Sequence, residues 1–150
     1  MKKTVLVSAC LLGISCRYDG KSKPDERVIA LAEKYNLVPV CPEIYGGLPT
    51  PRTPSERIGE RTVMKDGTDV TENYRLGAEA ALSLYRALGC DAALLKAKSP
   101  SCGVGEIYDG SFSGTLTERD GVTAELLLRE GIAVFSECEI PELEKYLDKV

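Results

Sequence analysis

The 150-residue sequence contains no histidine, so the side chain that most often binds metals and moves protons near neutral pH is missing. Any site must therefore work with thiolates, carboxylates, hydroxyls and lysines. No apolar run approaches the roughly 18 residues of a membrane-spanning helix, which argues against a transmembrane protein. The net charge of −4 disfavours binding to a nucleic-acid backbone, because phosphate contacts need a basic surface. A small-molecule ligand is the better expectation.

Cysteine pairs at the C-x-x-C spacing of a structural zinc site are also missing, although the chain has six cysteines. We expect a cytoplasmic protein, in which cysteines serve metal binding or catalysis rather than a disulfide framework. The charged start Met1-Lys-Lys and the stretch from Thr4 to Ser15 leave one alternative, a lipoprotein signal peptide with Cys16 as lipid acceptor. We disfavour it because removal of residues 1–15 would delete a predicted strand.

Apolar strand patterns alternate with helical periodicity, and the length predicts one domain over residues 1–150. We expect four strands and four helices, with strands near 4–8, 37–41, 91–97 and 132–135, and helices near 24–35, 74–88, 122–130 and from 141 onward. This alternation predicts an α/β fold of the Rossmann or flavodoxin-like type with a parallel sheet. Pro39 cannot donate to a sheet ladder, so its strand belongs at an edge. The strand order 2-1-3-4 meets that requirement.

Three other segments carry weaker signals. Residues 42–61 contain four prolines and are expected to form a long loop, in which Arg57 and Arg61 are expected to be solvated. A β-hairpin is predicted around Lys65-Asp66-Gly67. The glycine-rich segment 103–121 is expected to be irregular, and it lacks the glycine pattern of a phosphate-binding loop.

Four of the cysteines follow predicted strands: Cys10, Cys41, Cys102 and Cys138. The carboxyl ends of parallel strands meet at one edge of a sheet, so these thiols are expected to converge there. In the predicted strand order Cys10 and Cys102 flank the switch point, with Cys41 one strand away. Cys90 precedes a strand at the opposite edge and is expected to be a core residue.

Thiolates from three separate strands favour an iron–sulfur cube, because its corners lie several ångström apart. Three protein ligands would leave one iron open as a Lewis acid. A fourth ligand from Cys16 or Cys138 would close the cluster and favour electron transfer or a structural role. Structural zinc, and a metal-free cysteine enzyme that carries sulfur as a persulfide, are further alternatives.

Four stretches carry a family resemblance: Ser8-Ala-Cys-Leu-Leu-Gly, Cys16-Arg-Tyr-Asp-Gly, Cys41-Pro-Glu-Ile-Tyr-Gly-Gly-Leu-Pro-Thr-Pro-Arg and Lys98-Ser-Pro-Ser-Cys-Gly. Together they resemble the thiouracil desulfidases, and the resemblance covers essentially the whole chain. It implies a 4Fe–4S cluster held by three cysteines, which match Cys10, Cys41 and Cys102. It also implies removal of sulfur from a thiolated pyrimidine without net redox change.

In the reaction that this resemblance implies, the thiocarbonyl sulfur binds the open iron, and water activated by Glu43 attacks the carbon. The sulfur leaves as hydrosulfide, and Ser101 matches a serine expected to assist proton handling. Ser99 and Arg52 are candidate substrate contacts. The structural alternatives are turn formation around Pro100 for the two serines and a Glu43–Arg52 salt bridge. Longer relatives that act on thiolated tRNA carry an additional domain, so the expected substrate is a thiouracil-like base or nucleoside.

Overall fold

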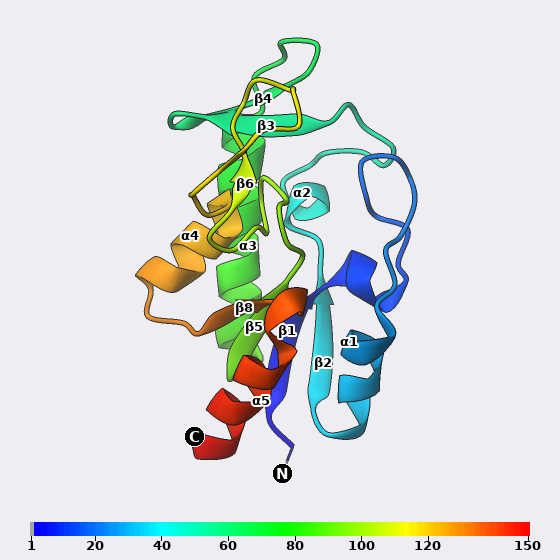
Figure 1. Ribbon diagram of the computed structural model, residues 1–150, viewed down its shortest axis with the longest axis vertical. Coiled ribbons are helices and arrows are strands. Elements are labelled where there is room, and N and C mark those ends of the chain that lie inside the picture. Colours follow the sequence, from blue (N-terminus) through cyan, green and yellow to red (C-terminus); the bar gives the residue numbers. More distant parts are fainter. Residues whose placement is uncertain (1) are drawn as a thin grey trace.

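The structure, a computed structural model, describes residues 2–150 and contains a four-stranded parallel sheet (Figure 1). Its order is β2-β1-β5-β8, from β1 (Thr4–Ser8), β2 (Asn36–Val40), β5 (Ala92–Leu95) and β8 (Val134–Ser136). The predicted α/β class and strand order are confirmed, with Pro39 on the edge strand β2. No helix in residues 2–150 is both long and apolar enough to cross a membrane.

The two faces of the sheet are covered by different helices: α1 (Glu26–Ala30) and α5 (Ile140–Lys149) on one, α3 (Thr71–Ala87) and α4 (Val122–Arg129) on the other. The alternation of side chains along β1 explains the division. Val5 and Val7 pack on the α1/α5 side, whereas Leu6 packs on the α3/α4 side. All three are fully buried, and burial of each such side chain stabilises the fold by about 1.5–3 kcal/mol.

The expectation of a long loop over residues 42–61 was wrong. Pro42 begins a one-turn helix, α2 (Pro42–Tyr45), because proline suits the first helical position, where the backbone N–H has no partner. Farther along, β3 (Ser55–Ile58) pairs with β4 (Arg61–Met64) in an antiparallel hairpin that lies beyond the carboxyl ends of the sheet strands (Figure 1). Its turn uses Gly59, whose φ of +60° suits glycine.

The turn predicted at residues 65–67 is present and follows β4. After the turn the chain forms only one isolated antiparallel bridge, between Val63 and Asp69, rather than a second full strand. The segment 103–121 is largely irregular, as expected, and contains one short hairpin of β6 (Ile107–Tyr108) and β7 (Leu116–Thr117). The remaining short helices are η1 (Ala9–Leu12), η2 (Leu31–Glu33) and η3 (Glu137–Glu139).

Arg57 corrects a further expectation, because it is only 4% exposed rather than solvated. Its guanidinium donates to the Asp120 carbonyl at 2.9 Å and pairs with Glu125 at 3.2 Å. These partners lie more than 60 residues away in sequence, so no local pattern could have identified them. Arg61 is exposed as expected and pairs with Asp69.

The short helix α2 lies backbone to backbone against α3. A Cβ atom on Gly77 would overlap the carbonyl oxygen of Pro42, and one on Gly46 would overlap that of Asn73. The Asn73 side chain also donates to the Gly46 carbonyl at 2.9 Å. Two glycines therefore permit a close approach that holds the residues following β2 in place.

Candidate active site

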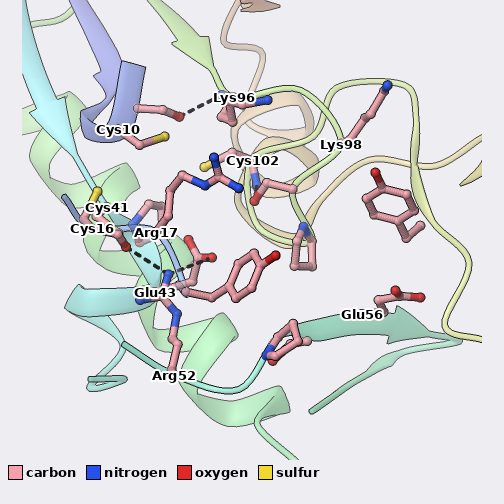
Figure 2. Close-up of a pocket in the computed structure, with 18 of the residues that line it drawn as sticks. Cys10, Cys16, Arg17, Cys41, Glu43, Arg52, Glu56, Lys96, Lys98 and Cys102 are labelled. Atoms are coloured by element: carbon pink, nitrogen blue, oxygen red, sulfur yellow. Dashed lines mark hydrogen bonds and ion pairs between the residues drawn. The ribbon is translucent and has the colours of Figure 1, made fainter. Parts of the chain in front are cut away.

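The carboxyl ends of the sheet strands border a cavity of about 630 Å³, lined in part by Cys10, Cys16, Cys41 and Cys102 (Figure 2). Cys10 lies in η1 after β1, Cys41 is the residue between β2 and α2, and Cys102 follows β5. The structure thus brings together the three cysteines expected at neighbouring strand ends. Cys10, Cys16 and Cys102 are buried and Cys41 is half-buried.

Local hydrogen bonds hold these cysteines in position. The Cys10 carbonyl accepts the backbone N–H groups of Gly13 and Lys23, which closes the turn after η1. The Ser99 hydroxyl accepts the N–H groups of Ser101 at 3.1 Å and Cys102 at 3.0 Å. The Cys10 and Cys102 loops are therefore held by backbone and turn residues, whereas the Cys41 thiol itself donates to the Cys16 carbonyl at 3.8 Å.

The sequence left Cys16 and Cys138 as alternative fourth ligands, and only Cys16 lies at the cavity. The Cys16 thiol lies against those of Cys10 and Cys41, and the contact with Cys10 raises its pKa to about 11. Cys138 is exposed and does not line the cavity, so the expected convergence was wrong for this residue. The Cys138 N–H donates to the Ser136 hydroxyl, which caps η3. Because η3 begins immediately after β8, Cys138 lies in this short helix and not in the cavity wall. Cys90 is buried in the core, as expected.

The cysteine arrangement bears on which metal group could fit. Among residues 2–150, no three cysteine or acidic side chains converge closely enough to hold one metal ion. The thiols surround a volume instead, which fits a cluster with separated metal corners better than a single zinc ion. Burial raises the pKa of Cys102, and hydrogen bonding to Cys16 raises the pKa of Cys41, so both thiols need cationic partners to ionise readily.

Glu43 reaches the cavity from α2, and Figure 2 shows it paired with Arg52. The charged atoms are 3.4 Å apart, and the side chains are only 13% and 4% exposed. Burial raises the pKa of Glu43, while the Arg52 charge opposes that shift. Arg52 also donates to the carbonyls of Cys16 at 3.1 Å and Pro49 at 3.2 Å. The predicted salt bridge is therefore present, and it fixes the carboxylate within the cavity wall.

The two candidate serines differ in their access to the cavity. Ser99 lines it, although its hydroxyl already accepts two backbone N–H groups. Ser101 is fully buried, is not part of the lining, and shares a 2.8 Å hydrogen bond with Thr123. Its hydroxyl also approaches Cys102 and favours the thiolate form of that cysteine. Its role in proton handling stays a prediction.

Basic side chains outnumber acidic ones in the cavity lining, in contrast to the net charge of the whole chain. The basic members are Arg17, Lys23, Arg52, Lys65, Lys96 and Lys98, and the acidic members are Glu43 and Glu56. Lys96 pairs with Glu137 at 3.1 Å, and Glu137 also accepts the Ala97 N–H at 2.7 Å. The Glu137 side chain thus connects the end of β8 to the segment that leads to Cys102.

Sequence reasoning missed the residues that form the far wall of the cavity. Ser55 and Glu56 reach it from β3, Tyr74 from α3, and Phe112 from the loop after β6. One Glu56 carboxylate oxygen accepts the N–H groups of Gly110 and Phe112, which holds that loop over the site. No motif signals these positions. Tyr74 reads in the sequence only as part of the apolar face of a helix.

Comparison with known proteins identifies the family. A family model for 2-thiouracil desulfurase matches residues 5–139. The Bacillus subtilis (strain 168) protein YbbK, described as uncharacterized, is 42% identical over 149 residues, which cover 93% of this chain and 99% of YbbK. The solved structure of the [4Fe-4S]-dependent thiouracil desulfidase TudS is 50% identical, with a TM-score of 0.94 over 99% of this chain and 100% of that one. The chain belongs to the 2-thiouracil desulfurase family.

Proposed function

We propose that this protein is an iron–sulfur-dependent desulfidase that replaces the sulfur of a thiouracil-like base or nucleoside by oxygen and releases hydrosulfide. The observation that carries the proposal is the thiol-lined cavity at the carboxyl edge of the sheet, with a buried carboxylate in its wall. TudS, which shares half of its residues with this chain, is described as acting on thiouracil with a [4Fe-4S] cofactor.

Cys10, Cys41 and Cys102 are the proposed ligands of a 4Fe–4S cluster. They are soft donors, they come from three neighbouring strand ends, and they surround a volume rather than a point. The basic residues of the lining would offset the negative charge that thiolates and sulfides bring. When bound with one iron free of protein ligands, such a cluster supplies a Lewis acid that polarises a C=S bond.

Glu43 is the proposed general base, because it is the carboxylate that reaches the cavity beside Cys41 and histidine is missing from the chain. It takes a proton from water, whose oxygen forms the new bond to the carbon that bears sulfur. The remaining hydroxyl proton of the adduct then passes to sulfur, the C–S bond breaks as the C=O bond forms, and sulfur departs as hydrosulfide. No oxidant or reductant is needed. Arg52 orients the carboxylate through the 3.4 Å ion pair. Contact of Arg52 or Ser99 with substrate, and proton transfer by Ser101, belong to the same proposal.

One observation favours a second candidate, a closed cluster that transfers electrons. The Cys16 thiol lies beside those of Cys10 and Cys41, where it could serve as a fourth ligand. A closed cluster would leave no position for a substrate sulfur. Hydrosulfide release separates the two candidates.

The deciding experiment measures iron, zinc and acid-labile sulfide in anaerobically prepared protein, and hydrosulfide release from 2-thiouracil. We expect about four irons and four sulfides per chain, with release of one hydrosulfide for each uracil formed. Cys102→Ala should lose both metal and activity, while Cys90→Ala, which changes a core cysteine outside the cavity, should keep both. One zinc without sulfide would refute the proposal, and a full cluster without hydrosulfide release would support the electron-transfer alternative.

A further inference from the structure

Two hydroxyl groups in the cavity wall have no role in the site described above. Ser55 begins β3 and Tyr74 lies in the first turn of α3, and their exposed fractions are 8% and 2%. The Ser55 hydroxyl is buried and has no hydrogen-bond partner among residues 2–150. Buried polar groups are nearly always paired, because an unpaired one destabilises the fold. An unpaired hydroxyl in a cavity wall therefore points to a ligand.

Tyr74 supplies a hydrogen-bond donor to the same cavity wall as the unpaired Ser55 hydroxyl. The phenolic O–H of Tyr74 is protonated near neutral pH and can donate a hydrogen bond. Tyr74 lines the same cavity as Glu43, the proposed base, and Cys102, a proposed cluster ligand. The Ser55 hydroxyl lies close enough to the phenol to lower its pKa against the effect of burial. The two groups do not reach hydrogen-bonding geometry, so the Ser55 oxygen keeps a free acceptor position. The pair thus presents one donor and one free acceptor side by side.

We propose that Tyr74 and Ser55 form the subsite that recognises the pyrimidine ring, an inference that rests on the proposed desulfidase function. A thiouracil ring carries an N–H between its thiocarbonyl and its remaining carbonyl. Tyr74 donates to that carbonyl oxygen, and Ser55 accepts the N–H. Both partners are neutral, so they select the ring by its hydrogen-bonding pattern rather than by charge.

The test compares 2-thiouracil with pyrimidine-2-thione, which keeps the thiocarbonyl but lacks the second carbonyl and the N–H between them. Tyr74→Phe and Ser55→Ala are each expected to lower kcat/KM for 2-thiouracil about 10-fold. The value for pyrimidine-2-thione should hardly change, so the preference between the two compounds shrinks. The matched controls are Tyr45→Phe and Ser83→Ala, which alter exposed side chains outside the cavity and should keep the preference.

Two further measurements keep this inference separate from the desulfidase proposal. Uracil binding to cluster-loaded protein, measured by equilibrium dialysis, should weaken about 10-fold in each variant, with iron content unchanged. Ser55→Ala should also keep or raise the Tm, because it removes a hydroxyl that has no partner. Unchanged uracil binding and an unchanged substrate preference in both variants would overturn the subsite. Absence of hydrosulfide release by the wild type would instead overturn the desulfidase function, and uracil binding would still decide the subsite.

Discussion

The amino and carboxyl ends of the parallel sheet place similar residues in opposite environments. At the amino end, Cys90 packs in the apolar core, and Asp91 forms two hydrogen bonds with the backbone of Thr4. The Asp91 carboxylate accepts the Thr4 N–H at 2.8 Å, and its own N–H donates to the Thr4 carbonyl at 2.7 Å. At the carboxyl end, cysteines and a buried carboxylate surround a cavity, and the Ser55 hydroxyl has no partner among residues 2–150.

The two ends of the sheet therefore have different roles: pairing at the amino end stabilises the fold, and incomplete pairing at the carboxyl end leaves groups for a ligand. The Asp91 groups at the amino end pair with neighbouring backbone, so they stabilise the fold. Polar groups at the carboxyl end are desolvated and only partly paired, which is costly for folding and useful for binding. Substitutions at the two ends should therefore produce different kinds of loss.

The largest effect is expected for the proposed cluster ligands. Alanine in place of Cys10, Cys41 or Cys102 should remove the cluster and lower desulfidase activity by more than about 100-fold. Changing residues that only hydrogen-bond to the ligands already costs up to that much at metal sites. All three variants should behave alike in iron content and hydrosulfide assays. Cys90→Ala at the amino end should lose stability while keeping its iron. A single essential cysteine among the three would favour persulfide chemistry instead.

A large effect confined to turnover is expected for Glu43→Gln. The amide keeps the shape of the side chain but cannot take a proton from water, so kcat should fall about 100-fold or more with little change in KM. Steady-state kinetics at matched iron content would measure this, with Glu60→Gln as the control because that side chain is 89% exposed. Loss of iron in Glu43→Gln would assign this residue to cluster binding rather than to proton transfer.

A moderate effect is expected where α2 meets α3. Helix propensity alone favours alanine over glycine by about 1 kcal/mol, but a Cβ on Gly77 would collide with the Pro42 carbonyl. We expect Gly77→Ala to lower the free energy of unfolding by about 1–3 kcal/mol through overpacking. Activity should fall as well, because Glu43 lies on the displaced helix. Denaturant titration measures the change in the free energy of unfolding, with Ser83→Ala on the exposed side of α3 as the control. Higher stability of Gly77→Ala would show that α2 can shift without strain.

The smallest effect is expected at Asp69, which follows the turn after β4 and does not line the cavity. Hydrogen bonds from Thr71 and Arg61 lower the pKa of Asp69 to about 2. Because this folded-state pKa lies below the unfolded value of about 3.9, its stabilisation is present above pH of about 4 and is lost as the pH falls toward 2. Asp69→Asn should therefore be slightly less stable than the wild type near neutral pH, with the difference vanishing in acid. Thermal melts against pH would measure it, with Asp148→Asn as control; a difference that persists at low pH would point to a cause other than ionisation.

The sequence by itself determined the α/β class, the strand order and the place of three cysteines. These features depend on local information: apolar alternation sets the strands, Pro39 sends its strand to an edge, and parallel strands share one carboxyl end. Cys10, Cys41 and Cys102 could therefore be assigned to one site before any distance was known. Glu43 was identified through the family resemblance, and its position two residues after Cys41 supported that assignment.

Only the tertiary structure decided which side chains face one another across the cavity. Arg57 is buried because its partners arrive from the segment before α4 and from α4 itself. Cys138 misses the cavity because η3 begins immediately after β8, whereas Cys16 reaches it through the turn after η1. Ser55 and Tyr74 meet because a hairpin and a helix from different parts of the chain close the same wall. Burial and pairing depend on such long-range packing, and residue patterns in one sequence do not encode it directly.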